Sequence, residues 1–148
     1  MQAGSAVCVI GQTIRRELFA GVPELLAGLR QRQLQLAVAT GKSRLGLNSA
    51  LDSSGLGPLF DATRTADETA SKPHPQMLLE LMDELDVAPE RTLMIGDTTH
   101  DLQLARNAGT ASLGVSYGAH EPESFGALQP LAVLHSTREL HDWLVLHA

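Results

Sequence analysis

The sequence has a single cysteine, Cys8, and no apolar run long enough to cross a membrane. One cysteine excludes an intrachain disulfide, and apolar runs well short of about 18 residues predict no transmembrane helix. The first ten residues carry no positive charge ahead of their apolar run, so nothing here predicts a secretory signal peptide. We therefore expect a cytoplasmic protein without a membrane partner.

Basic residues are also scarce. The 148 residues include 11 Lys and Arg against 17 Asp and Glu, which gives a net charge of −6, and no basic stripe is visible. Binding to a nucleic-acid backbone needs a basic patch, so this charge balance argues against such a partner. With 43% apolar and 19% charged residues, the chain is expected to form one globular domain over residues 1–148.

Short apolar strands alternate with helical patterns along the chain. This order predicts an α/β fold, a Rossmann-like three-layer sandwich with a mostly parallel sheet and helices on both faces. The expected strands are residues 6–10, 34–39, 60–65, 92–95, 111–115 and 131–134. The expected helices are residues 23–32, 43–52, 76–85 and 100–107, and a last helix that opens at Ser136 with a capping box completed by Glu139.

Polar residues gather where predicted strands end or elements meet. The three clusters are Thr40-Gly41-Lys42-Ser43, Ser71-Lys72-Pro73 and Gly96-Asp97-Thr98-Thr99-His100-Asp101. Ligands of open parallel sheets bind at the carboxyl ends of the strands, so we expect the first and third clusters to share one edge. The lysine of the second cluster could reach the same place.

These residue types suit phosphoryl transfer, which needs charge balance, hydrogen-bond donors and a metal. Asp97 and Asp101 offer the oxygen ligands that Mg²⁺ prefers, and Lys72 offers a fixed positive charge. The Thr40 hydroxyl and the backbone N–H groups of Gly41 and Lys42, at an expected helix start, suit phosphate oxygens.

The three clusters resemble, in order and spacing, signatures of the haloacid dehalogenase superfamily. The sequence Ala37-Val38-Ala39-Thr40-Gly41 is similar to its second signature, Ser71-Lys72-Pro73-His74-Pro75 to its lysine signature, and Gly96-Asp97-Thr98-Thr99-His100-Asp101 to its Gly-Asp-x-x-x-Asp signature. The resemblance runs from about Phe19 to the end and is closest to the phosphoglycolate-phosphatase-like group.

This resemblance implies Mg²⁺-dependent hydrolysis of a small phosphorylated metabolite through an aspartyl-phosphate. Thr40 and Gly41 would hold the phosphate, and Lys72 would orient the nucleophile and neutralise charge. Asp97 would bind Mg²⁺, and Asp101 would support a metal-bound water or Lys72.

The chain departs from the family at its first signature, Asp-x-Asp-Gly-Thr, which carries the nucleophile. No aspartate precedes Asp52, and the family's cap domain is also missing. Cys8 lies in an apolar run and reads as an inert core thiol rather than a substitute nucleophile. We therefore expect a capless core with little or no activity.

Losing the nucleophile strand would leave unpaired backbone on two central strands, at about 1–3 kcal/mol for each buried group. We expect residues 5–10, within an atypical N-terminal segment 1–18, to fill that central position. The alternative is that a second copy of the chain fills it.

Three functional hypotheses stay open: a feeble phosphatase core, a phosphate- and Mg²⁺-binding or dimeric interaction module, and a truncated version of an active phosphatase. A response-regulator receiver is a rival of another class, but it too needs an aspartate at a strand end before the Thr. Simpler alternatives also exist for the residues themselves, namely helix capping by Asp97, a plain turn at Thr40-Gly41, and a solvated Lys72.

Overall fold

The computed structural model describes residues 7–10, 22–115 and 128–147. The strands are β1 (Val7–Ile10), β2 (Gln35–Thr40), β3 (Ala62–Thr65), β4 (Thr92–Gly96), β5 (Ala111–Val115) and β6 (Val133–Leu134). The helices are α1 (Val22–Gln31), α2 (Arg44–Ser54), α3 (Gln76–Leu85), α4 (Thr99–Ala108) and α5 (Thr137–His147), with 3-10 helices η2 (Gly57–Leu59) and η3 (Pro89–Arg91). Strands and helices thus alternate, as the sequence predicts.

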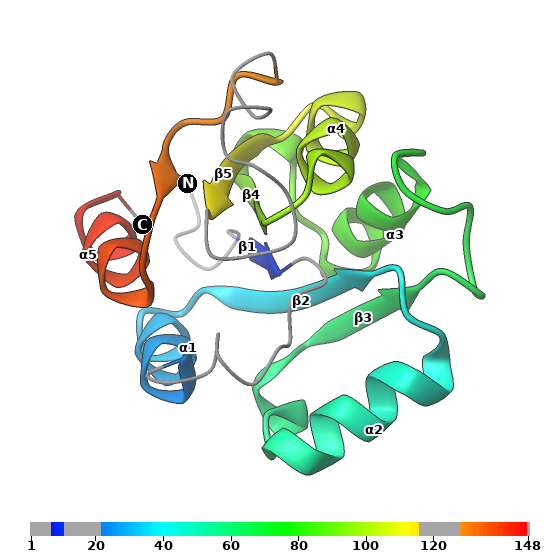
Figure 1. The fold of residues 1–148 in the computed structure, drawn as a ribbon, viewed down its shortest axis with the longest axis horizontal. Coiled ribbons are helices and arrows are strands. Elements are labelled where there is room, and N and C mark those ends of the chain that lie inside the picture. The colour runs from blue at the N-terminus through cyan, green and yellow to red at the C-terminus, as the bar shows by residue number, and fades with distance from the viewer. Residues whose placement is uncertain (1–6, 11–21, 116–127, 148) are drawn as a thin grey trace.

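The strands form one sheet in the order β3-β2-β1-β4-β5-β6, and every neighbouring pair is parallel. Parallel neighbours must be joined by crossover connections, which here contain the helices. Helices α3 and α4 lie on one face of the sheet and α1 and α5 on the other, while α2 lies along the β3 edge (Figure 1). The predicted α/β sandwich is confirmed.

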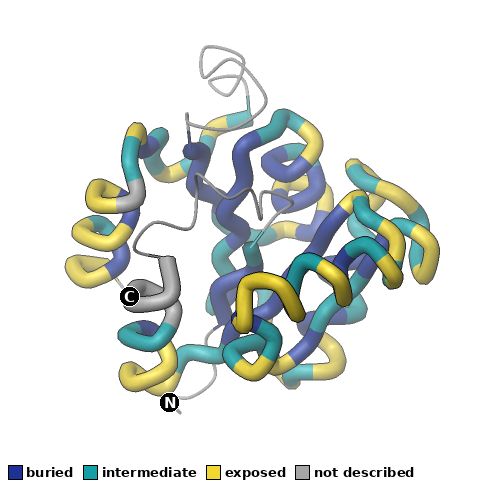
Figure 2. The backbone as a smooth tube through the Cα atoms, turned by 60° about the horizontal axis from the view of Figure 1, so that its bottom comes forward, coloured by how far each residue is buried: buried dark blue, intermediate teal, exposed yellow. Residues whose placement is uncertain are grey.

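Side chains that alternate along the strands supply two separate cores. Val7 and Val9 join a cluster with residues of α3 and α4, whereas Cys8 joins a cluster with residues of α1 and α5. Buried backbone runs through the middle of the domain, and exposed residues line the outer helix surfaces (Figure 2). The sheet is therefore buried on both faces, which explains why its strands read as nearly continuous apolar runs.

Strand β1 lies at the centre of the sheet, between β2 and β4. Ile10 pairs with Val38 on one side and with Ile95 on the other. Val7, Cys8 and Val9 are at most 3% exposed. The apolar segment expected to fill the central position thus contributes Val7–Ile10 to it.

The helix ends follow the sequence signals. Gly55 and Gly109 end α2 and α4 with φ of 71° and 81°, in the left-handed region that glycine adopts most easily. At the start of α5, the Glu139 N–H donates to Ser136 Oγ over 3.1 Å. The Glu139 carboxylate accepts from the N–H of His135, one residue earlier than a capping box would have it.

The last strand is shorter than predicted. The sequence suggests residues 131–134, but β6 covers only Val133–Leu134. The chain enters this strand through Gln129, whose φ is 53°, and through Pro130, which has no N–H to donate to a ladder. Regular pairing therefore starts late at this edge.

Some expectations lie outside the described residues. They concern Gly11 to Ile14 after β1, most of the Phe19-Ala20-Gly21-Val22 segment, and the loop after Val115. Across the described ranges, no helix combines the length and apolar character that a bilayer crossing requires.

We predict that Val9→Ala lowers the free energy of unfolding by about 2 kcal/mol, because it deletes two buried methyl groups from the central strand. Val9 is 0% exposed. Val145→Ala is the matched control, since Val145 is 45% exposed on α5 and should change stability by less than about 0.5 kcal/mol. Urea denaturation measures both, and equal effects would contradict the central placement of β1.

Candidate functional site

The candidate site lies at the carboxyl edge of the sheet, where β2 and β4 end on either side of β1. Val38 and Ile95 are level with each other because both pair with Ile10. Thr40 and Asp97 each follow two residues later. With neighbouring strands about 4.8 Å apart, roughly 10 Å separate these two chain positions. The sequence-based expectation that they share one edge is met.

Thr40 ends β2 as a buried residue, 1% exposed, and Gly41 after it is exposed. The Lys42 N–H donates to Thr40 Oγ1 over 3.1 Å, so this amide is engaged inside the turn rather than open to a phosphate. Helix α2 begins only at Arg44, with Ser43 as its N-cap. The expectation that Gly41 and Lys42 lie at the helix start is therefore wrong, because the turn runs two residues longer.

An internal carboxylate holds the first amide of α2. Asp67 accepts the Arg44 N–H with both oxygens, over 3.0 and 3.1 Å, and accepts from Thr65 Oγ1 over 2.5 Å. The Thr65 hydroxyl, and then the Arg44 amide, hold the pKa of Asp67 below its usual range. A carboxylate is favoured there because a helix N-terminus carries partial positive charge.

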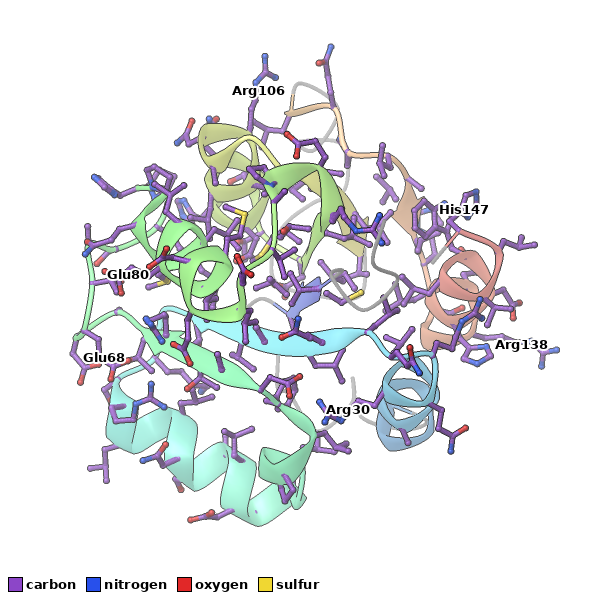
Figure 3. The ribbon with its side chains drawn as sticks, turned by 180° about the vertical axis from the view of Figure 1, so that it is seen from behind. Arg30, Glu68, Glu80, Arg106, Arg138 and His147 are labelled. Carbon is purple, nitrogen blue, oxygen red and sulfur yellow. The ribbon has the colours of Figure 1, made fainter. Side chains whose placement is uncertain are left out.

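The Arg44 side chain ties α2 to the same loop. It donates to both carboxylate oxygens of Glu68, over 2.7 and 3.2 Å, and to Thr63 Oγ1 over 2.8 Å. Figure 3 shows Glu68 on the side of the molecule opposite His147. Sequence reasoning missed Asp67 and Glu68, since their partner lies more than 20 residues away and leaves no local pattern.

Lys72 arrives from the loop between β3 and α3 and forms an ion pair with Asp101 Oδ1. The side chains are 6% and 0% exposed. The alternative of a solvated surface lysine is therefore wrong. The peptide bond from Lys72 to Pro73 is cis, and the Pro73 carbonyl accepts from Asn107 Nδ2 over 2.8 Å. Lys72 thus reaches the same edge as Asp97.

Gly96 makes room for the Asp101 carboxylate. A Cβ at residue 96 would lie 2.2 Å from Asp101 Cβ and 2.6 Å from its Oδ2. The glycine of the Gly-Asp-x-x-x-Asp motif is needed here for space. It lets the first turn of α4 approach the end of β4.

Asp97 is buried, 0% exposed, and directly follows β4. The N-cap of α4 is Thr98, whose Oγ1 accepts from the Asp101 N–H over 3.1 Å. The alternative that Asp97 caps this helix is therefore wrong. Its carboxylate is left for another role.

The donor set at this edge fits a Mg²⁺ ion. Asp101 Oδ2 is buried and accepts no hydrogen bond from the residues described, and Asp97 adds a second buried carboxylate nearby in the motif. Mg²⁺ is commonly held by one or two protein carboxylates together with water and substrate oxygens. In the described part of the chain, no three His, Cys, Asp or Glu side chains converge, so two carboxylates are what the protein offers.

Two other features can be set apart from the site. Cys8 is 3% exposed, and burial raises its pKa to about 12, which rules it out as a nucleophile near neutral pH. A cavity of about 460 Å³ lies at the opposite edge, lined by the first residues of β1, β4 and β5 and by Trp143 and His147. None of the candidate residues lines it.

Comparison with known proteins gives a family match. The family model for haloacid dehalogenase-like hydrolases matches residues 12–115, which begins just after β1. The probable phosphatase IndB of Dickeya dadantii is 40% identical over 124 residues, 83% of this chain and 54% of that protein. The phosphoglycolate phosphatase of Escherichia coli is 30% identical over 83% of this chain and 49% of its own length.

Among solved structures, one described as a predicted phosphatase from Clostridium acetobutylicum superposes with a TM-score of 0.79. It is 26% identical, and the match covers 86% of this chain and 60% of that one. The chain spans about half the length of the curated relatives it matches.

We predict that Gly96→Ala destabilises the fold by about 1–3 kcal/mol, because the added methyl overlaps the Asp101 side chain. Gly28→Ala in α1 is the matched control. A Cβ there meets nothing within 4 Å, and alanine should stabilise the helix by about 0.5–1 kcal/mol. Thermal unfolding of both variants measures the difference, and a tolerated Gly96→Ala would contradict the close approach.

We also predict that Cys8 resists 5,5′-dithiobis(2-nitrobenzoate) at pH 8 in the folded chain and reacts fully in urea. A pKa of about 12 leaves about one thiol in ten thousand ionised at this pH. Rapid reaction of the folded chain would show that Cys8 is accessible, and would return it to the list of nucleophile candidates.

Proposed function

The chain belongs to the haloacid dehalogenase-like hydrolase family, and on that premise we propose that it binds a small phosphate monoester together with Mg²⁺. We further propose that, as this chain, it hydrolyses the ester feebly or not at all. The observation that carries the proposal is the buried ion pair of Lys72 and Asp101 at the strand edge that also carries Thr40 and Asp97.

The phosphate would lie between the ends of β2 and β4. The Thr40 hydroxyl and the Gly41 N–H would donate to its oxygens, and Lys72 would balance their charge. A phosphate there replaces solvent around a lysine that is already nearly buried, 6% exposed, which strengthens their attraction.

Mg²⁺ would be held by Asp97, with Asp101 either as a second ligand or as the support of Lys72 and a metal-bound water. When bound, the ion would supply charge neutralisation for the phosphoryl oxygens. Asp101 Oδ2 supports this assignment, because a buried carboxylate oxygen without a hydrogen bond is costly unless it meets a cation or water.

Turnover is expected to be weak because the chain offers no carboxylate to attack phosphorus. No aspartate precedes Asp52, and Gly11-Gln12-Thr13-Ile14, which follows β1 in the chain, carries no acidic residue. Catalytic residues that act as a unit lose most of their effect together when one is missing. The binding half of the site would outlast the loss.

The substrate class is that of a small phosphorylated metabolite such as phosphoglycolate, and the expected location is the cytoplasm. The first rests on the family and on the phosphoglycolate phosphatase of Escherichia coli among the relatives. The second candidate function is a phosphate- and Mg²⁺-binding module without turnover, including a dimeric one, and the absent nucleophile favours it.

We predict that the purified chain hydrolyses p-nitrophenyl phosphate with Mg²⁺ no faster than Asp97→Asn does, yet binds orthophosphate with Mg²⁺. Asp97→Asn should weaken that binding at least about tenfold, because it removes a metal ligand. Asp83→Asn, an exposed change of the same charge on α3, is the control. Calorimetry and a colorimetric assay measure the two quantities.

Two results would overturn parts of this proposal. Hydrolysis that needs Mg²⁺ and disappears in Asp97→Asn would show that the chain has a nucleophile after all. Failure of the unmodified chain to bind orthophosphate, with or without Mg²⁺, would refute the binding role itself.

A further inference from the structure

We infer that Asn107 is a positioning residue for Lys72, acting through the Pro73 carbonyl. Asn107 Nδ2 donates to Pro73 O over 2.8 Å, across 34 residues of sequence. Pro73 directly follows Lys72, so the hydrogen bond fixes the backbone from which the lysine side chain extends.

Helix α4 therefore holds the lysine at both of its ends. Asp101, in the first turn of α4, pairs with the ammonium group, and Asn107, in the last turn, binds the carbonyl beside the lysine backbone. Six residues of α-helix separate the two, about 9 Å along the axis. A lysine side chain stretched between these two points has little freedom to turn elsewhere.

The orientation of the Asn107 amide is itself fixed by a neighbour. Gln103, one turn earlier on α4, donates from Nε2 to Asn107 Oδ1 over 2.8 Å. That contact occupies the oxygen and leaves the NH₂ group facing the Pro73 carbonyl. The chain of contacts runs from Gln103 to Asn107 to Pro73, and it ends at the lysine.

Asn107 is exposed, which separates a positioning role from a structural one. Water could satisfy its amide and the Pro73 carbonyl, so no buried polar group is stranded when the contact is lost. Leucine is a better helix former than asparagine, so Asn107→Leu should leave stability unchanged or raise it. A loss of lysine placement in a fold that is no less stable is what distinguishes the two roles.

The chain contains an internal reference for measuring this placement. It has two lysines, Lys42 and Lys72, and only Lys72 lies in the ion pair. Brief acetylation of the full chain with acetic anhydride, followed by peptide mass spectrometry, gives the ratio of Lys72 to Lys42 modification without any bound ligand.

We predict that Asn107→Leu raises the Lys72 to Lys42 ratio severalfold and weakens orthophosphate binding about fivefold, the usual effect of losing one hydrogen bond. Gln103→Leu should change both in the same direction by less. Asn48→Leu on α2 is the matched control, because Asn48 contacts Arg44 and not the lysine loop. It should leave the ratio and the affinity unchanged.

The orthophosphate measurement rests on the proposed function, whereas the acetylation ratio does not. If the unmodified chain fails to bind orthophosphate, the proposed function fails and the ratio still tests Asn107. An unchanged ratio in Asn107→Leu, with the fold intact by circular dichroism, would overturn the inference. So would a lowered melting temperature that accounts for an equal rise in modification of both lysines.

Discussion

The pairing of β1 with β2 on one side and β4 on the other is the constraint on which the rest of this structure depends. A strand in this position satisfies backbone groups of two neighbours that have no access to water, and each group left unpaired would cost about 1–3 kcal/mol. The same pairing brings the ends of β2 and β4 level. The edge that carries Thr40 and Asp97 is thus a product of register, before any side chain contributes.

Charge is the second organising element. Lys72 and Asp101 are both nearly removed from water, and desolvating two charges is repaid only when their contact and their further hydrogen bonds are good. The loop that carries Lys72 is secured from two directions. Asp67 and Glu68 bind the start of α2, and the Pro73 carbonyl binds the end of α4. None of these contacts needs a residue from the first strand, so the lysine can keep its place in a chain without the family nucleophile.

The sequence predicted the fold well because its signals were local. Helix α3 and strand β5 have the bounds that their patterns predicted, and Gly55 and Gly109 end helices as expected. The motif order also placed Lys72 beside Asp101. What could not be predicted depends on register and on distant partners: the extra turn before α2, the Asp67 carboxylate on its first amide, and the amide of Asn107 on the lysine loop. Such contacts join residues about 20 to 35 positions apart and leave no periodicity to detect.

The central position of β1 also determines the order in which this domain can assemble. Val7 pairs with Gln35, 28 residues later, and with Thr92, 85 residues later. During synthesis the strand leaves the ribosome first, yet its second neighbour appears only after more than half of the chain has been made. Contacts of such long sequence separation slow folding, because the entropy of closing the loop is lost before the contact forms. Until β4 arrives, an apolar strand with an open edge stays exposed to other chains, so the growing polypeptide is most prone to aggregation in the interval before residue 92 is made.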